Sequence, residues 1–293
     1  MNLKSIIEAA NITRADSIHP GFGFLSENSK FAQICEESNI KFIGPSYKVI
    51  ERMGNKSNSK EMMKKAGVPV IPGSEGAIKD LEQAKKVAKE VGYPILLKAS
   101  AGGGGKGIRI VNYPEDLEES LELVRQEAKL SFSDDEIYIE KYIKNPRHIE
   151  VQILADEQGN TIYLGERDCT VQRKNQKIIE ETPSPVIDSK LRTKICETAV
   201  KAAKAAEYTN AGTVEFLLDE DKNFYFMEMN TRIQVEHPIT EENTGIDLIK
   251  AQIRIAAGEP LILKQNKVNI TGHSIECRIN AENPDKNFRP SPR

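Results

Sequence analysis

Three oxygen-bearing side chains, Glu215, Glu228 and Asn230, fall within a segment that predicts a β-hairpin over residues 212–230. If the hairpin turns symmetrically at Asp221–Lys222, Glu215 and Glu228 face each other with Cβ atoms about 4.5–5.5 Å apart. Asn230 lies on the same face, because strand side chains alternate. Two buried carboxylates at this separation repel each other, and a divalent cation relieves the repulsion. The pattern therefore predicts a site for Mg²⁺ or Mn²⁺, which prefer such oxygen ligands.

Polar and apolar residues continue to alternate after the hairpin. If the chain stays extended, one side carries Glu228, Asn230, Arg232, Gln234 and Glu236, and the other carries Met229, Ile233 and Val235. A solvated strand face usually mixes lysine and glutamate, whereas this face offers metal ligands, an arginine and a carboxylate before a turn-forming His-Pro pair. We interpret it as the lining of a site, with a salt-bridged surface strand as the alternative.

A run of four glycines, Gly102–Gly105, precedes Lys106 and Gly107. Their spacing matches G-x-G-x-x-G, but the following "IRIVNY" is β-branched and alternating, which disfavours the helix that a dinucleotide site needs. The segment predicts two strands joined by a glycine loop whose N–H groups cradle phosphate oxygens. Lys98 and Lys106 add positive charge. The alternative is a flexible surface turn. Elsewhere Lys177, His148 and Arg278 are candidate site residues, although isolated polar residues are more often on the surface.

The elements that must position these residues fall into two patterns. The first part alternates helix and strand, which predicts helices covering a parallel sheet. From residue 68 onward the pattern becomes α+β, so the predicted fold class is α/β and α+β with several domains. Helices are predicted over 2–12, 46–66, 79–91, 114–129, 189–207 and 245–258, with another after Asn28. Strands are predicted over 40–46, 94–100, 107–113, 136–143, 148–156, 161–172 and 273–282, besides the hairpin. The alternation starts without a first strand and the chain ends in a turn, so we expect a sequence clipped at both ends.

Composition restricts the class of protein. With 293 residues the chain is long enough for about two domains. A net charge of −3 argues against a general nucleic-acid binder, and no apolar run approaches the roughly 20 residues of a membrane span. Without a signal-peptide layout at its start, we expect a cytoplasmic protein. The four cysteines form no C-x-x-C pair and are expected to be reduced and structural.

Several long motifs resemble biotin carboxylase, the ATP-grasp component of acetyl-CoA carboxylase. They are "HPGFGFLSEN", "KASAGGGGKG", "EKYIKNPRHIEVQILAD", "ERDCTVQRKNQKIIEETPSP", "FMEMNTRIQVEHPITE" and "ECRINAE". The same block occurs in pyruvate and propionyl-CoA carboxylases, and carbamoyl phosphate synthase is a more distant relative. The resemblance covers essentially the whole chain. It implies a partial N-terminal (pre-ATP-grasp) domain over 1–50, an ATP-grasp domain over 51–260 with a glycine-flap lobe at about 70–143, and the start of a truncated C-terminal domain over 261–293.

The resemblance also implies a reaction. ATP and bicarbonate give carboxyphosphate and ADP, and the carboxyl group then passes to N1′ of biotin on a biotin carboxyl carrier protein. Two Mg²⁺ or Mn²⁺ ions assist. In fatty acid synthesis the further partners are carboxyltransferase subunits, and a homodimer is one assembly to expect. The final carboxyl acceptor is chosen by a different component of the enzyme.

Residue roles implied by the resemblance fall into three groups. Nucleotide contacts are expected at Lys56, Lys98, Gly104, Gly105, Glu140, Lys141, Tyr142, Ile143, His148, Gln172 and Asn175. Metal ligands are expected at Glu215, Glu228 and Asn230. The bicarbonate pocket is expected to comprise Lys177, Arg232, Gln234 and Val235, with Glu236 as the base and Arg278 holding bicarbonate and the biotin enolate.

Three positions depart from the family pattern: Asn175 replaces a common histidine, Asn55 replaces an aspartate before Lys56, and Arg293 replaces a glycine. None of these removes a proposed catalytic group. Two hypotheses therefore stay open, an active carboxylase component and a truncated fragment that binds nucleotide or a partner without turnover. An ATP-grasp ligase for another small acid is a third, disfavoured by "NTRIQVEHP" and "ECRINAE".

Overall fold

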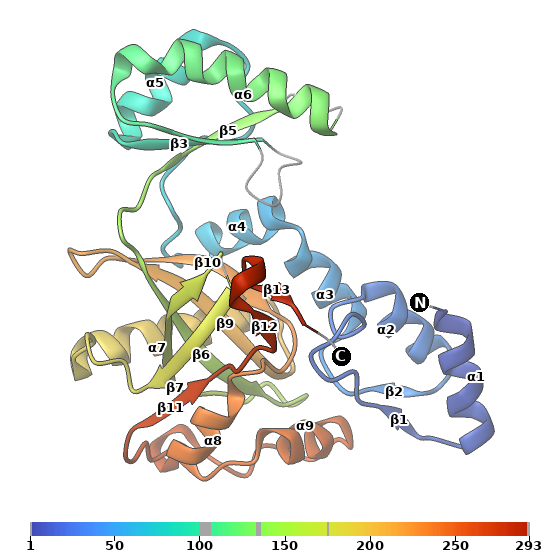
Figure 1. Cartoon of the computed structure of the whole chain (residues 1–293). Helices are drawn as coiled ribbons and strands as arrows, with labels where there is room; N and C mark the ends of the chain where they lie inside the picture. Colours follow the sequence, from blue (N-terminus) through green and yellow to red (C-terminus); the bar gives the residue numbers. More distant parts are fainter. Residues whose placement is uncertain (1, 100–106, 133–135, 175, 292–293) are drawn as a thin grey trace. The chain divides into compact units, whose positions relative to one another are not determined.

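The protein, seen in a computed structural model, divides into two compact bodies, one formed by Met1–Pro69 with Pro146–Arg293 and the other by Val70–Asn145 (Figure 1). The structure describes residues 2–99, 107–132, 136–174 and 176–291. Within these residues, no helix is long and apolar enough to cross a membrane.

The first part of the larger body is a small α/β unit, as predicted. Helices α1 (Leu3–Thr13) and α2 (Ser29–Glu37) accompany a short parallel pair, β1 (Ser17–Ile18) and β2 (Lys41–Phe42). The side chain of Asn28 caps α2 by accepting a hydrogen bond from Phe31 N. Phe31 also packs edge-on against Phe42, with ring centroids 6.1 Å apart. The predicted strand over 40–46 is thus much shorter than expected.

The prediction of a single helix over residues 46–66 is wrong. The chain forms α3 (Tyr47–Gly54) and α4 (Lys56–Lys65), separated by Asn55 in an extended conformation with ψ 106°. The Asn55 side chain accepts a hydrogen bond from Asn58 N at 2.9 Å and so starts the second helix. An asparagine at this position therefore serves as an N-cap.

A six-stranded antiparallel sheet forms the centre of the larger body. Its spatial order is β10 (Phe224–Asn230), β9 (Asn210–Leu218), β6 (Arg147–Ala155), β7 (Thr161–Arg173), β8 (Gln176–Thr182) and β11 (Ser274–Cys277). Strand β8 was not predicted, because its lysine and glutamates are typical of an exposed loop. It is held by the ladders that it forms with β7 on one side and β11 on the other.

The helices of this body bury apolar faces against the sheet. Helix α7 (Ser189–Ala205) packs on β6 and β7 and buries Ile195 and Cys196. The helix predicted over 245–258 is instead α9 (Leu248–Ala256), and an unpredicted helix α8 (His237–Thr244) precedes it. Gly245, at φ 69°, ends α8 in a left-handed conformation that suits glycine. Short 3₁₀ turns (Gln265–Lys267 and Pro284–Lys286) and the pair β12 (Glu282–Asn283) and β13 (Arg289–Pro290) complete the body.

The β9–β10 hairpin contains a β-bulge that matters for the site. The ladder begins with Leu218 opposite Phe224, one residue out of the predicted register. A shift between Phe226 and Glu228 then places Glu228 opposite Glu215. The predicted pairing of the two carboxylates is therefore confirmed, but it depends on a bulge that a symmetric turn did not anticipate.

The smaller body is a three-stranded antiparallel sheet in the order β4 (Ile108–Val111), β3 (Ile95–Ala99) and β5 (Ile137–Lys141). Helices α5 (Leu81–Val91) and α6 (Leu117–Phe132), with a 3₁₀ turn at Pro114–Asp116, pack against it. Ala99 N donates to Gly107 O at 2.8 Å, which confirms the predicted pairing of the strands on either side of the glycine run. Gly102–Gly105 lie outside the described residues.

Candidate functional site

The larger body contains a cavity of about 630 Å³ above the central sheet. Strands β6 to β10 and the segments that follow β10 and β11 line it, so distant parts of the sequence meet there. The predicted site residues among them are His148, Gln172, Lys177, Glu215, Glu228, Asn230, Arg232, Gln234, Val235, Glu236 and Arg278. The prediction that the chain stays extended to Glu236 is wrong, because β10 ends at Asn230 and a turn leads to α8. Val235 therefore lines the cavity together with Gln234 and Glu236 instead of facing away from them.

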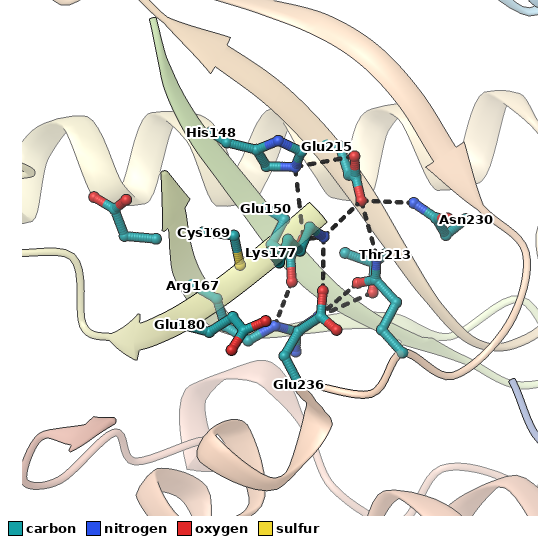
Figure 2. Close-up of polar contacts among 12 residues, drawn as sticks. His148, Glu150, Arg167, Cys169, Lys177, Glu180, Thr213, Glu215, Asn230 and Glu236 are labelled. Atoms are coloured by element: carbon teal, nitrogen blue, oxygen red, sulfur yellow. Dashed lines mark hydrogen bonds and ion pairs between the residues drawn. The ribbon is translucent and has the colours of Figure 1, made fainter. Parts of the chain in front are cut away.

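Lys177, on β8, is the centre of the charge network. Figure 2 shows its ammonium group among three carboxylates, and Nζ lies 2.5 Å from Glu150 Oε2, 3.0 Å from Glu215 Oε1 and 2.6 Å from Glu236 Oε1. The lysine side chain is only 13% exposed. Although burial disfavours its charge, the surrounding carboxylates dominate and raise the pKa of Lys177 above its ordinary value.

Glu150 and Arg167 form a fully buried ion pair beside the cavity that the sequence did not predict. Arg167 Nε donates to Glu150 Oε1 at 2.6 Å, and both side chains are fully buried. The two terminal nitrogens of Arg167 bond to four further side-chain oxygens, those of Gln152, Thr240, Thr213 and Gln234. Burial opposes the charge on Glu150, but Arg167 and Lys177 outweigh it and lower its pKa. Arg167 therefore holds in place both the Glu150 carboxylate, which contacts Lys177, and the side-chain amide of Gln234.

Glu215, on β9, is held from several sides. His148 Nε2 lies 3.0 Å from its Oε2, while Asn230 Nδ2 and Gln234 Nε2 both donate to its Oε1 at 2.8 Å. Burial opposes ionisation, but the His148 hydrogen bond and the Lys177 ammonium prevail and lower the pKa of Glu215 to about 2. The same histidine–glutamate contact raises the pKa of His148, against the effect of its burial.

The metal ligands expected at Glu215, Glu228 and Asn230 share the cavity wall. The two carboxylates lie opposite each other in the ladder, and Asn230 follows on the same strand as Glu228. These are hard oxygen donors, and Glu215 is a buried carboxylate of low pKa, so the set fits a divalent cation such as Mg²⁺ or Mn²⁺. His148, Glu150 and Glu215 also have ligand atoms within 4.8 Å of one another, but the Lys177 ammonium already lies against Glu150 and Glu215.

Arg278 lies directly after β11 and reaches the cavity wall. Its Nε donates to Glu180 Oε1 at 2.7 Å and its Nη2 donates to Glu236 Oε2 at 2.7 Å. Both oxygens of Glu236 are therefore held by cations, Lys177 on one and Arg278 on the other. Glu180, which the sequence did not single out, is fully buried, and burial raises its pKa to about 7 despite the adjacent Arg278.

Arg232 lies at the wall of the cavity where β10 has ended. Its Nη2 donates to Asn230 Oδ1 at 3.0 Å, and its Nε donates to Glu27 Oε2 at 2.9 Å. Together with Lys177 and Arg278 it places three cationic groups around one cavity. Such a cavity can hold a small planar anion, with a carboxylate, Glu236, within the same wall to exchange a proton.

Of the other predicted nucleotide contacts, several belong to the smaller body and several lie outside the described residues. Gly104, Gly105 and Asn175 lie outside them, and Lys56 is the first residue of α4. In the smaller body, Lys98 forms an ion pair with Glu140 across β3 and β5. The expected adenine-contacting stretch, from Glu140 through Lys141 and Tyr142 to Ile143, is fixed within that body: Lys141 N donates to Pro72 O at 2.8 Å and Tyr142 N to Pro94 O at 3.1 Å. Gln172 Nε2 lies 3.1 Å from His148 Nδ1 at the cavity.

Comparisons with known proteins agree on one family. Residues 55–264 match the family described as "Carbamoyl-phosphate synthase L chain, ATP binding domain", and residues 1–50 match "Biotin carboxylase, N-terminal domain". The chain is 56% identical over 293 residues to biotin carboxylase 1 of Bacillus subtilis (strain 168), covering all of this chain and 65% of that protein. It is 53% identical over 292 residues to a pyruvate carboxylase component of Methanothermobacter thermautotrophicus, covering all of this chain and 59% of that protein.

A solved structure extends the likeness to three dimensions. The biotin carboxylase domain dimer of Hydrogenobacter thermophilus 2-oxoglutarate carboxylase, in complex with MgADP, ADP and bicarbonate, superposes with a TM-score of 0.86 at 56% identity. The alignment covers 99% of this chain and 64% of that one. The chain thus spans about 65% of the length of the curated relative from Bacillus subtilis.

Proposed function

We propose, because the chain belongs to the biotin carboxylase family of ATP-grasp proteins, that it uses ATP and bicarbonate to carboxylate biotin. The reaction gives ADP and carboxyphosphate. The carboxyl group of carboxyphosphate then passes to N1′ of biotin on a carrier protein, and N1′ loses its proton as phosphate is released. The observation that carries this proposal is the placement of Glu236 between Lys177 and Arg278 in the wall of the 630 Å³ cavity.

Glu236 acts as the base in this proposal. Bicarbonate is a poor nucleophile while it keeps its proton, and a carboxylate within hydrogen-bond reach can remove that proton. Lys177 and Arg278 hold the two oxygens of Glu236 at 2.6 Å and 2.7 Å, so the carboxylate is oriented before the anion arrives. A fixed orientation removes a reorganisation cost from the proton transfer.

Bicarbonate is held by the groups around Glu236. The guanidinium of Arg232 offers a planar fork that matches a planar anion, and Lys177 contributes charge without a directional requirement. Gln234 is immobilised by Arg167 below it and by Glu215 beside it. Val235 completes this part of the wall. The cations compensate the charge of the anion, while buried Glu150 holds Lys177 in place.

The nucleotide and metal roles rest on the remaining residues. Lys56, Lys98, His148, Gln172 and Asn175, with the flap at Gly104 and Gly105 and the stretch from Glu140 to Ile143, are proposed to contact ATP. Glu215, Glu228 and Asn230 would hold the divalent ions. When bound, these ions supply charge that stabilises the transferred phosphoryl group. The chain's own residues bind the anion, orient it and accept its proton.

For the parent enzyme we propose acetyl-CoA carboxylase, with a biotin carboxyl carrier protein and carboxyltransferase subunits as partners and a homodimer as the assembly. The long motifs that resemble the acetyl-CoA carboxylase component, among them "FMEMNTRIQVEHPITE" and "ECRINAE", support this choice. A role in pyruvate or propionyl-CoA carboxylase is the alternative, favoured by the pyruvate carboxylase relative. Supplying carrier protein and carboxyltransferase from each system, and measuring which acceptor gains ¹⁴C from bicarbonate, distinguishes them.

The activity itself is tested by following ADP release with Mg²⁺, with and without bicarbonate and with and without free biotin. We expect release that requires bicarbonate and increases with biotin. Nucleotide binding without turnover would instead support an inactive nucleotide-binding fragment. Turnover that ignores biotin would point to an ATP-grasp ligase for another acid.

A further inference from the structure

Glu27 connects a distant part of the chain to the wall of the site. It lies between β1 and α2, yet its carboxylate contacts the two residues that follow β10. Oε1 accepts hydrogen bonds from Thr231 N at 2.9 Å and Thr231 Oγ1 at 3.3 Å, and Oε2 accepts one from Arg232 Nε at 2.9 Å. Glu27 itself lines a separate cavity of about 170 Å³. Its contact with the wall of the larger cavity is made through Arg232, which lines that cavity.

The backbone around Glu27 is fixed on both sides. Ser26, which is buried, bonds through both N and Oγ to Gly23 O, at 3.1 Å and 2.7 Å. Asn28 caps α2 by accepting from Phe31 N at 2.8 Å. The carboxylate of Glu27 is thus presented from an anchored turn rather than from a loose loop, which suits a group that must hold another side chain in one orientation.

The contacts of Arg232 leave its outer edge free to bind an anion. Nε is bonded to Glu27, Nη2 to Asn230 Oδ1 at 3.0 Å and Nη1 to Ile233 O at 3.2 Å. Each terminal nitrogen of a guanidinium carries a second N–H group that these described bonds do not use. Because Arg232 also lines the cavity, those N–H groups can form a two-point contact with a planar anion.

We propose that Glu27 positions Arg232 for bicarbonate, which makes the turn before α2 part of the bicarbonate site. This inference rests on the proposed function. The side chains of Arg232 and Glu27 are 23% and 40% exposed, and ion pairs that are this exposed add little to folding stability. The contribution of the pair is therefore expected in anion binding rather than in folding.

The test is a Glu27→Gln variant in the full chain, measured by bicarbonate-dependent ADP release. The amide oxygen of glutamine can still accept from Thr231 N, but the variant has no second carboxylate oxygen to hold Arg232 Nε. We expect the KM for bicarbonate to rise about tenfold, the effect of losing one charge-assisted hydrogen bond. The KM for ATP and kcat at saturating bicarbonate should change less than about twofold. Glu27→Asp, which keeps the charge but shortens the reach, should fall between the wild type and Glu27→Gln.

A matched control is Glu157→Gln. Glu157 also pairs with the N-terminal part of the chain, through Lys41 Nζ at 2.5 Å, and the two side chains are 43% and 46% exposed. It lies in the β6–β7 turn, outside the lining of the cavity. Its KM for bicarbonate should equal that of the wild type. An unchanged bicarbonate KM in Glu27→Gln, or an equal rise in both variants, overturns the inference.

Failure of the proposed function can be separated from failure of this inference. If the wild type does not cleave ATP with bicarbonate, the proposed function fails. Anion binding can still be measured by heat unfolding in sodium bicarbonate, with sodium chloride of equal ionic strength as the reference. We expect bicarbonate to raise the unfolding midpoint of the wild type and of Glu157→Gln more than that of Glu27→Gln. Equal shifts in all three proteins, or no shift in any, contradict a role for Glu27 in binding the anion.

Discussion

Replacing Lys177 with methionine tests the charge network at the centre of the site. Methionine is similar in length but carries no charge, so three carboxylates that now lie 2.5–3.0 Å from Nζ lose their shared cation. Breaking a buried ion pair by removing one partner costs about 3–5 kcal/mol, because the other charge stays buried. Arg167, Arg278 and His148 still compensate part of the charge. We therefore expect a loss of about 3 kcal/mol, the lower end of that range.

Urea unfolding at neutral pH measures this loss, with Lys4→Met as the control. Lys4 is 86% exposed and lies 4.0 Å from Glu8, so its replacement should change the free energy of unfolding only slightly. Glu215, whose pKa is about 2 in the folded protein against an ordinary value of 4.5, contributes stability that is present above 4.5 and is lost as the pH falls towards 2. Lys177 is one cause of that pKa shift. The difference in free energy of unfolding between the variant and the wild type should therefore become smaller as the pH falls below about 4.5. A variant within about 1 kcal/mol of the wild type at neutral pH would refute this view of Lys177.

Three further substitutions test individual roles. Glu236→Gln should abolish bicarbonate-dependent ATP cleavage while the Kd for nucleotide stays near normal, and a large loss of nucleotide binding would count against Glu236 as the base. Arg278→Ala should leave ATP binding intact and impair carboxyl transfer to biotin, so an unchanged transfer rate would contradict its role. Glu180 has a pKa raised from 4.5 to about 7, so it contributes stability below pH 4.5 that is lost as the pH rises to 7. Glu180→Gln mimics the protonated form, so as the pH rises from 4.5 to 7 its free energy of unfolding should increase by on the order of 3 kcal/mol relative to that of the wild type. Parallel profiles of unfolding free energy against pH for the two proteins would show that Glu180 does not titrate in this range.

The sequence pattern was sufficient to predict the neighbours of site residues that lie on one face of a single hairpin. A symmetric turn assumed at Asp221–Lys222 put Glu215 opposite Glu228, and alternation placed Asn230 on the same face as Glu228. The argument for that pairing was incomplete, however. The strands leave the turn one residue out of the predicted register, and a β-bulge between Phe226 and Glu228 restores the predicted pairing at Glu228. A bulge has no residue signature of its own here, so only the assembled ladder reveals it.

Residues that meet through the sheet could not be placed from the sequence. Lys177 was named, but the strand that carries it was not predicted, because most residues of "NQKIIEETP" are charged or polar. Glu150, Arg167 and Glu180 were not singled out, since charged residues in strands are normally exposed and these are buried only because partner charges and hydrogen bonds surround them. A glutamate between Ile149 and Val151 in "HIEVQILAD" was the available signal for Glu150.

Glu27 shows a different limit of sequence reasoning. The motif "HPGFGFLSEN" carried a family resemblance, but nothing in it indicated which residue reaches the site. Its contact with Arg232 spans 205 positions, so it depends on how the N-terminal α/β unit packs near the end of β10. Long-range placement of this kind follows from tertiary structure rather than from local pattern.

The fate of bicarbonate oxygen tests the proposed reaction most directly. The wild type would be incubated with ATP, Mg²⁺ and bicarbonate labelled with ¹⁸O, and the released phosphate examined by ³¹P NMR or mass spectrometry. If a bicarbonate oxygen attacks the γ-phosphorus after Glu236 removes its proton, the released phosphate carries one ¹⁸O atom. Phosphate whose new oxygen comes from water would contradict this reaction, because water rather than the anion held by Lys177, Arg232 and Arg278 would then be the nucleophile.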